Sequence, residues 1–195
     1  MKTVGIIGAG SFGITLVKIL SRNVNVIIYS RNESVVKDIN EKHIHMGNEL
    51  RLNVKATTDI KEITKGCELL FAVVPSSNFR QMMKDFCPFL KPSHIMIQCT
   101  KGLDVSRICE EDWLNLNFKR DDVCTMTEVI RQESNVIRVG CLSGPNLAKE
   151  ILSGQPAATV IASEFDEVIK LGQTVLSSKK FFAFGSHDLK AAEIA

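Results

Sequence analysis

Three glycines near the amino terminus have the spacing that points most directly to chemistry. They occupy the first, third and sixth positions of segment 8–13, which reads Gly-Ala-Gly-Ser-Phe-Gly. In a turn from a strand to a helix, Gly8 permits the tight turn, Gly10 lets the backbone approach a pyrophosphate, and Gly13 lets the helix pack closely on the strand. The phosphates would face the open N–H groups of a helix that begins near Ser11. The pattern therefore predicts a dinucleotide-binding turn.

A second candidate, Arg31, bears on which dinucleotide is bound. It lies 23 positions after Gly8. At a distance of about 20 residues, an acidic residue binds the ribose 2′-hydroxyl of NAD, whereas an arginine accommodates the 2′-phosphate of NADP. Ser30 adds a hydroxyl beside Arg31, and Glu33 places a carboxylate nearby. The segment favours NADPH as the cofactor and leaves NADH open.

Three further candidates follow later apolar runs, where the ends of parallel strands would bring them to one edge of a sheet. Lys101 follows the run 95–99, and Pro75 follows an earlier run. A lysine at that edge presents a compact cation to a phosphate or a carbonyl oxygen. A later run leads to Gly144, where small residues would let a ligand approach the backbone, and to Pro145, which suits the first turn of a helix.

The elements that must hold these residues alternate regularly along the chain. Apolar runs of strand length alternate with segments of helical apolar spacing, which predicts an α/β fold with a doubly wound, mostly parallel Rossmann-type sheet and helices on both faces. The expected strands are 2–7, 24–29, 54–57, 68–74, 95–99, 136–142, 158–162 and 181–184. The expected helices are 11–20, 33–41, 59–65, 78–90, 125–133, 164–176 and one that starts at Asp188, with irregular segments at 43–48 and 103–124.

Composition restricts the class of protein and its partners. The chain has 195 residues, of which 45% are hydrophobic and 24% are charged, as is usual for a soluble globular protein. Its net charge of +2 gives no general argument for a nucleic acid or an anionic membrane as partner. No apolar stretch approaches the ~20 residues that span a bilayer, and the first strand has no signal-peptide pattern, so we expect a cytoplasmic protein.

The cysteines and histidines form no metal-binding pattern. The six cysteines are scattered, without a CxxC pair or a histidine-associated spacing, so we expect reduced, packed thiols. His43 and His45 are two positions apart, but no third ligand is evident nearby. We therefore expect a surface loop there and no metal.

Six motifs, taken together and in order, give the chain a resemblance to a known family. They are GAGSFG (8–13), YSRN (29–32), KATTD (55–59), AVVPS (72–76), TKG (100–102) and LSGPNLAKE (142–150), and they extend over nearly the whole chain. The chain resembles the N-terminal half of bacterial-type NAD(P)-dependent glycerol-3-phosphate dehydrogenases. This resemblance implies hydride transfer between C4 of a nicotinamide and C2 of dihydroxyacetone phosphate, giving sn-glycerol 3-phosphate, the entry compound of glycerophospholipid synthesis.

The resemblance also implies roles for individual residues. The implied cofactor contacts, added to Gly8, Gly10, Gly13 and Pro75, are Ser11, Phe12, Arg31, Lys101 and Ala148. Lys101 would also contact the substrate, with Gly144 and Asn146 as substrate neighbours. Phe12 stands where bacterial members commonly have Trp, and Asn146 stands where they usually have Ser, so the substrate role of Asn146 is open.

The resemblance predicts a dinucleotide-binding domain over 1–187 and the start of a helical substrate domain at 188–195. Family members carry the principal catalytic lysine, in a Lys-Asn pair, and the arginine that binds the substrate phosphate in an all-helical C-terminal domain. Reduction of a ketone needs a proton donor and a cation for the phosphate besides the hydride donor. We therefore expect the 195-residue chain to bind NADPH but to turn over negligibly alone. A homodimer of the full-length form is compatible with the resemblance.

Two other functions fit the same motifs. A neighbouring β-hydroxy-acid or ketopantoate-type reductase would differ in its substrate, which a substrate panel would show. A non-catalytic dinucleotide-binding or sensing module would bind the cofactor without a reaction.

Overall fold

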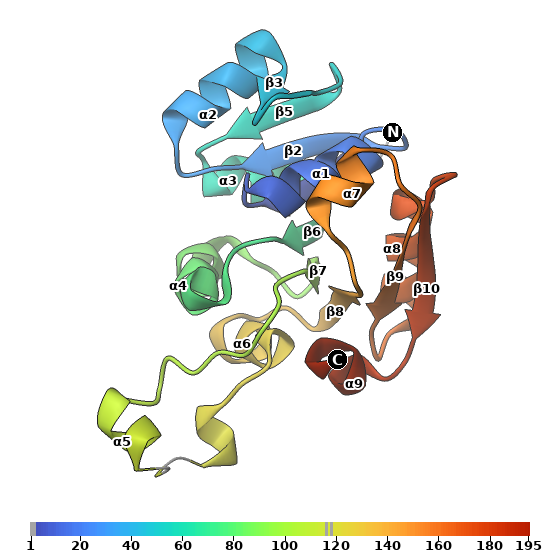
Figure 1. Cartoon of the computed structure of the whole chain (residues 1–195). Coiled ribbons are helices and arrows are strands. Elements are labelled where there is room, and N and C mark those ends of the chain that lie inside the picture. The colour runs from blue at the N-terminus through green and yellow to red at the C-terminus, as the bar shows by residue number, and fades with distance from the viewer. Residues whose placement is uncertain (1–2, 116, 118) are drawn as a thin grey trace.

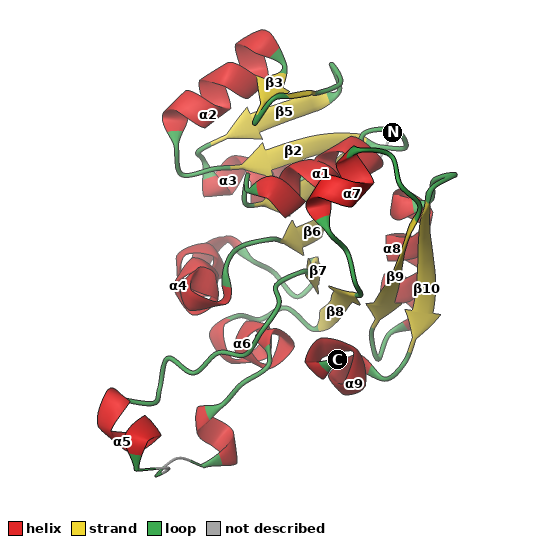
Figure 2. Ribbon diagram, in the orientation of Figure 1, coloured by secondary structure: helices red, strands yellow, loops and turns green. Residues whose placement is uncertain are grey.

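One sheet of parallel and antiparallel strands lies at the centre of the chain (Figures 1 and 2). The computed structural model describes residues 3–115, 117 and 119–195, so the expected strand start at Lys2 and positions Leu116 and Phe118 of the expected irregular segment lie outside the described residues. The strands are β1 (Thr3–Ile7), β2 (Asn25–Tyr29), β5 (Val54–Thr57), β6 (Leu69–Ala72), β7 (Ile95–Gln98), β8 (Arg138–Ser143), β9 (Ala157–Ala162) and β10 (Phe181–Ser186).

The strand order is that of a dinucleotide-binding sheet with two added strands. The order across the sheet is β5-β2-β1-β6-β7-β8-β9-β10. All neighbouring pairs are parallel except β8 and β9, which are antiparallel. From β5 to β8 this is the Rossmann order, whose switch point lies between β1 and β6. The expected doubly wound, mostly parallel sheet is confirmed.

Helices cover both faces of this sheet. One apolar cluster holds side chains of α1 (Ser11–Leu20), α2 (Glu33–Lys37), α7 (Ala148–Leu152) and α8 (Asp166–Leu176), and a second holds those of α3 (Ile60–Gly66), α4 (Ser76–Phe86), α6 (Met126–Glu133) and α9 (Leu189–Ile194). In β1, Ile6 and Ile7 are both fully buried but belong to different clusters, because successive side chains of a strand point to opposite faces. Burial on both faces explains the continuous apolar runs of the sequence.

The segment expected to be an irregular loop at 43–48 is instead a small hairpin. It consists of β3 (Ile44–His45) and β4 (Asn48–Glu49), which pair antiparallel. Met46 and Gly47 form its turn with φ of 49° and 71°, the backbone twist that suits two-residue hairpins. Strands of two residues are too short to show an alternating pattern, which is why the sequence did not reveal them.

Helices also differ from their expected bounds, and the one expected over 78–90 is α4, which ends at Phe86 and is followed by a 3₁₀ turn over Cys87–Phe89. The helix expected over 33–41 ends as an α-helix at Lys37 and continues as a π-helical turn over Asp38–Lys42. Pro145 does not begin a helix, because α7 starts at Ala148. Instead, the chain bends at Gly144 and Pro145, the Asn146 N–H donates to the Gly144 carbonyl oxygen at 2.8 Å, and the Asn146 side chain donates to Thr159 of β9.

The irregular segment between β7 and α6 contains two short helical turns, α5 (Glu110–Leu114) and a 3₁₀ turn over Arg120–Asp122. It extends away from the sheet in Figure 1. All six cysteines are free, and Cys109 in this segment is exposed. Burial raises the pKa of the Cys67 and Cys141 thiols to about 12. In the described part of the chain, no helix combines the length and apolar character needed to cross a membrane.

Candidate functional site

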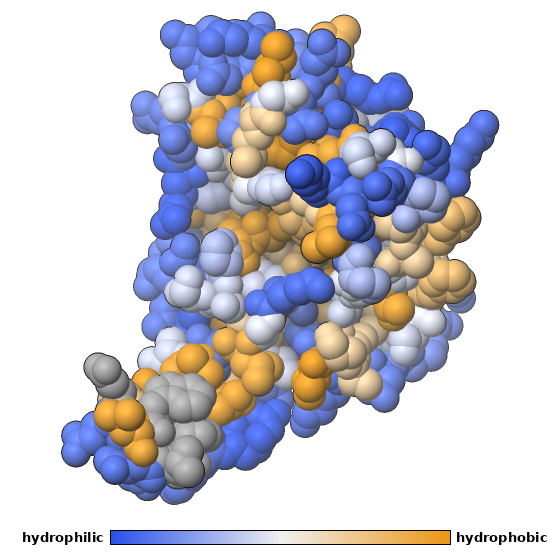
Figure 3. Space-filling model, in the orientation of Figure 1, coloured by the Kyte–Doolittle hydropathy of each residue, from blue (hydrophilic) through white to orange (hydrophobic). Residues whose placement is uncertain are grey.

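A crevice crosses the carboxyl edge of the sheet at the switch point. It consists of a cavity of about 780 Å³ beside β2 and α4 and a cavity of about 380 Å³ beside the ends of β7 and β8. The two cavities share Gly10 and the segment 73–75 as lining residues. Figure 3 shows apolar residues gathered in the hollow between the polar outer parts of this face. A ligand with two ends could therefore lie across the edge of the sheet.

The glycine turn lies where the two cavities meet, and its three glycines have different surroundings. Gly8 has φ of +117°, and a Cβ atom there would lie 2.2 Å from the Val73 carbonyl oxygen. A Cβ atom on Gly13 would lie 2.1 Å from the Gly8 carbonyl oxygen. Gly10 is exposed, and a Cβ atom there would meet no atom within 4 Å. Gly8 and Gly13 therefore permit close packing, whereas Gly10 keeps space open.

The amino terminus of α1 faces this open space. Gly10 is its N-cap residue, with φ of −74° and ψ of −179°, and no side chain caps it within the described residues. The first N–H groups of a helix have no partner inside the helix, and its amino-terminal end carries partial positive charge. The turn therefore offers donors to an anion such as a pyrophosphate.

The larger cavity ends at the residues that follow β2. Arg31 is exposed and lines this cavity, and no ion pair engages it in the described part of the chain. Ser30 is buried, and its Oγ accepts a hydrogen bond from the Asn32 N–H at 3.2 Å. Glu33 and Asp85 line the same cavity. The larger cavity is thus lined by one guanidinium, which follows β2, and by the carboxylates of Glu33 in α2 and Asp85 in α4.

The smaller cavity is organised around Lys101. Its Nζ donates a hydrogen bond of 2.9 Å to the carbonyl oxygen of Gly144, which joins the segments that follow β7 and β8. Gly144 has φ of +145°, and a Cβ atom there would lie 3.2 Å from the Ala158 carbonyl oxygen. Among the described residues that line this cavity, Lys101 carries the sole charge.

Asn146 lies in the same cavity with half of its amide unpaired. Its Nδ2 donates to Thr159 Oγ1 at 2.9 Å, and that hydroxyl donates to the Ser143 carbonyl oxygen at 2.8 Å. The Asn146 Oδ1 atom is buried and has no hydrogen-bond partner in the described structure. Since buried acceptors are almost always paired, this oxygen is a candidate contact for a ligand donor.

The structure places every predicted site residue on this crevice. The residues lining the smaller cavity include Gly10, Ser11, Phe12, Gly13, Pro75, Lys101, Gly144, Asn146 and Ala148, and those lining the larger cavity include Gly8, Gly10, Arg31 and Pro75. No group of three histidine, cysteine or acidic side chains among the described residues is arranged to hold a metal ion.

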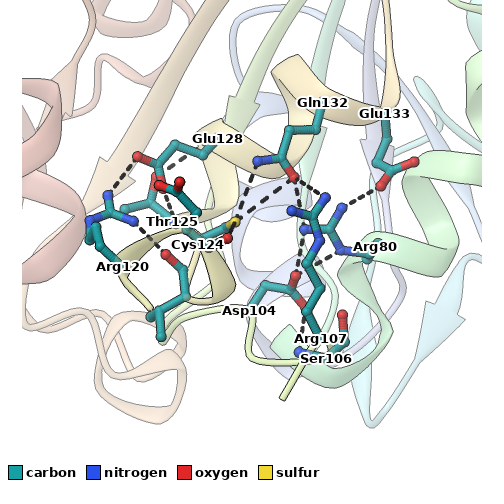
Figure 4. A network of polar contacts seen from close by, with 12 residues as sticks. Arg80, Asp104, Ser106, Arg107, Arg120, Cys124, Thr125, Glu128, Gln132 and Glu133 are labelled. Carbon is teal, nitrogen blue, oxygen red and sulfur yellow. Dashed lines mark hydrogen bonds and ion pairs between the residues drawn. The ribbon is translucent and has the colours of Figure 1, made fainter. Parts of the chain in front are cut away.

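Several supporting residues were not found from the sequence. Thr100 Oγ1 donates to the Val74 carbonyl oxygen at 2.7 Å, which joins the two segments that flank the smaller cavity. A larger group surrounds Arg80 of α4 (Figure 4). Its Nε donates to Asp104 Oδ2 at 2.7 Å, and its other nitrogens contact Glu133 and Gln132 of α6. These partners are far apart in sequence and form no motif.

The Arg80 network fixes the segment that follows Lys101. Asp104 is 4% exposed, and its backbone pairs with Cys124. We expect Arg80→Ala to lower the free energy of unfolding by about 3 kcal/mol, because it leaves the buried Asp104 carboxylate without its charged partner. Urea unfolding would measure this loss. A change smaller than that of exposed Arg22→Ala would show that the Asp104 carboxylate does not need Arg80.

Comparison with known proteins places this chain in a family. The family model described as NAD-dependent glycerol-3-phosphate dehydrogenase N-terminus matches residues 3–169. The glycerol-3-phosphate dehydrogenase (NAD(P)+) of Acinetobacter baylyi is 32% identical over 196 residues, which cover 98% of this chain and 50% of that protein. The protein of the same name from Corynebacterium urealyticum is 32% identical over 202 residues, which cover 100% of this chain and 56% of that protein. The chain thus spans about half the length of the curated relatives it matches.

Solved structures share the fold. Glycerol-3-phosphate dehydrogenase from Coxiella burnetii matches with a TM-score of 0.83 and 23% identity, over 98% of this chain and 56% of that one. Pyrroline carboxylate reductase from Plasmodium falciparum, solved with NADP bound, matches with a TM-score of 0.61 and 12% identity. The match covers 95% of this chain and 57% of that one. At these identities the structures show the fold alone. The match over residues 3–169 shows that this chain belongs to the NAD-dependent glycerol-3-phosphate dehydrogenase family, as its N-terminal, NAD-binding domain.

Proposed function

We propose that this chain is the cofactor-binding part of an enzyme that uses NADPH to reduce dihydroxyacetone phosphate to sn-glycerol 3-phosphate for glycerophospholipid synthesis. One observation carries the proposal. A continuous crevice at the carboxyl edge of the sheet has Arg31 at one end, the uncapped start of α1 at its centre, and Lys101 at the other end. These are the positions where a 2′-phosphate, a pyrophosphate and a reacting carbonyl would need positive charge or donors.

The residues fit this cofactor. The space beside Gly10 is open, so the N–H groups of the first turn of α1 can reach a pyrophosphate. The Arg31 guanidinium can donate two hydrogen bonds to a phosphate. When bound, NADPH supplies a hydride to the carbonyl carbon of the substrate. The cavity beside Lys101 and Ala148 would exclude water from the nicotinamide end.

Lys101 would hold the substrate oxygen. A lysine ammonium has three donors, and the Gly144 carbonyl oxygen takes one of them at 2.9 Å. This contact fixes the ammonium at the mouth of the cavity and leaves two donors for the carbonyl or phosphate oxygen of the substrate. Negative charge that develops on the carbonyl oxygen is stabilised by such a preoriented cation. The unpaired Oδ1 of Asn146 would accept a hydrogen bond from a substrate hydroxyl.

The same proposal divides the chain into a dinucleotide-binding domain over 1–187 and the beginning of a helical substrate domain at 188–195. The Asp188 side chain caps α9 by accepting from the Ala191 N–H at 2.9 Å. The Glu193 carboxylate accepts from Gln98 Nε2 and from the Thr127 N–H, both at 2.9 Å. These contacts anchor α9 beside the strand that leads to Lys101.

Titration and a steady-state assay test the proposal together. We expect the purified 195-residue chain to bind NADPH in isothermal titration calorimetry and to show no measurable oxidation of NADPH with dihydroxyacetone phosphate. The reason is that one lysine cannot both hold the substrate phosphate and supply the proton. Steady-state turnover would contradict the expectation that this chain binds the cofactor but lacks groups needed for catalysis. A chain that binds neither NADPH nor NADH would contradict the proposed function as a whole.

The preference for NADPH should depend on Arg31. We expect Arg31→Ala to weaken NADPH binding about tenfold, since a charge-assisted hydrogen bond contributes about 1.5 to 3 kcal/mol and this one is partly solvated. NADH binding should change by less than about twofold, because NADH has no 2′-phosphate for the guanidinium. Parallel titrations of parent, Arg31→Ala and the exposed control Arg22→Ala would measure both. Equal weakening of NADPH binding and NADH binding by Arg31→Ala would show that Arg31 does not recognise the 2′-phosphate.

A further inference from the structure

The β3–β4 hairpin contacts the glycine turn through one side chain, His45. Its Nε2 lies 3.0 Å from the carbonyl oxygen of Ala9. A carbonyl oxygen can only accept a hydrogen bond, so Nε2 must carry the proton in this contact. In the described structure, Ala9 and Gly10 line the larger cavity, whereas His45 lines neither cavity. His45 therefore contacts the turn from outside the crevice.

This contact fixes the direction of a peptide group that faces the crevice. The described residues contain no cis peptide bonds, and in a planar trans peptide the C=O and the following N–H point in opposite directions. A hydrogen bond that holds the Ala9 carbonyl toward the hairpin therefore directs the Gly10 N–H away from the hairpin, and Gly10 lines both cavities of the crevice. Gly10 has neither a side chain nor a side-chain cap to fix this peptide. Among the contacts of the described residues, the hydrogen bond from His45 is the one that holds the Ala9 carbonyl oxygen.

The hairpin is itself anchored to the helix that the turn begins. Lys18 Nζ of α1 donates to Asn48 Oδ1 at 3.3 Å, and Asn48 is the partner of His45 in the hairpin. At the base of the hairpin, the Leu50 N–H donates to the His43 carbonyl oxygen at 2.7 Å, and Leu50 is 7% exposed. The hairpin is therefore placed by α1 and by the core.

We propose that His45 is a positioning residue for dinucleotide binding, which orients the Gly10 N–H toward the pyrophosphate by holding the Ala9 carbonyl. The inference rests on the proposed binding of NADPH in the crevice. It assigns a function to a hairpin that lies outside the residues lining that crevice. A donor preoriented before the ligand arrives spares the ligand the entropic cost of ordering the turn.

Variants of the 195-residue chain at His45 separate this role from hairpin stability. His45→Ala removes the donor, and we expect NADPH binding to weaken about fivefold, the equivalent of one neutral hydrogen bond of about 1 kcal/mol. His45→Gln keeps an N–H donor at nearly the reach of Nε2 and should restore affinity to within about twofold. Ile44→Ala is the matched control, since Ile44 is the other β3 residue, is 45% exposed and points to the opposite face of the hairpin.

The amide spectrum of the cofactor-free protein gives a second readout that does not depend on NADPH. In ¹H–¹⁵N spectra, the Gly10 resonance should move in His45→Ala and return toward its parent position in His45→Gln, with Ile44→Ala unchanged. Parent-like NADPH affinity or a parent-like Gly10 resonance in His45→Ala would overturn the inference. Equal weakening of NADPH binding by His45→Gln and His45→Ala would overturn it as well. If the parent chain bound no dinucleotide, the proposed function would fail, and the Gly10 resonance would still decide the role of His45.

Discussion

Gly10→Ala should fold like the parent chain and bind NADPH about 100-fold more weakly. The backbone of Gly10, with φ of −74° and ψ of −179°, is one that alanine adopts without strain, and a Cβ atom meets nothing within 4 Å. The loss of glycine at an N-cap position costs about 1 kcal/mol or less. The new methyl group would nevertheless occupy the space through which the pyrophosphate reaches the first turn of α1. Losing two charge-assisted hydrogen bonds there corresponds to about 3 kcal/mol.

Urea unfolding and calorimetric titration of the same preparation measure both parts of this expectation. The unfolding midpoint should remain near that of the parent, while NADPH and NADH binding should weaken together, because both dinucleotides contain the pyrophosphate. A Gly10→Ala chain that binds NADPH as tightly as the parent would show that the phosphates do not approach the turn.

Gly13→Ala, unlike Gly10→Ala, should destabilise the fold itself. Within a helix, alanine is normally favoured over glycine by about 1 kcal/mol. At Gly13, however, a Cβ atom would lie 2.1 Å from the Gly8 carbonyl oxygen, and this backbone atom cannot move aside as a flexible side chain could. Overpacking of this kind costs about 1 to 3 kcal/mol and sometimes more, so the cost of the clash exceeds the gain in helix propensity. We expect a net loss of about 2 kcal/mol in the free energy of unfolding.

Denaturant unfolding of Gly13→Ala alongside Gly10→Ala provides the measurement, because the two variants add the same methyl group three positions apart. Destabilisation at 13 with near-parent stability at 10 is the expected pair of results. A Gly13→Ala chain as stable as the parent or more stable would mean that α1 does not pack as closely on the turn as the structure indicates.

The central sheet was predictable from the sequence because its strands are buried on both faces. Ile6 and Ile7 enter different apolar clusters, so the run around them had to be continuous and was easy to recognise. The meeting of Lys101 with Gly144 was predictable in outline, since β7 and β8 are parallel neighbours whose ends reach the same edge. Their hydrogen bond joins two loop segments whose conformation, including the positive φ of Gly144, no sequence pattern specifies.

Contacts between side chains remote in sequence were not predictable. The Arg80–Asp104 pair and the Asn146–Thr159 pair connect different elements, and each depends on packing that forms only in the complete fold. The hairpin at His45 was missed for a different reason, because its strands are only two residues long and its turn uses a left-handed Met46 where asparagine or glycine is the usual signal.

A crystal structure of the 195-residue chain grown with NADPH would show whether one crevice holds the whole dinucleotide. We expect the pyrophosphate against the N–H groups at Gly10 and the 2′-phosphate within hydrogen-bond distance of Arg31. We expect the nicotinamide in the cavity lined by Lys101 and Ala148. A dinucleotide bound elsewhere, or one whose nicotinamide lies away from Lys101, would show that this crevice does not hold the cofactor as proposed.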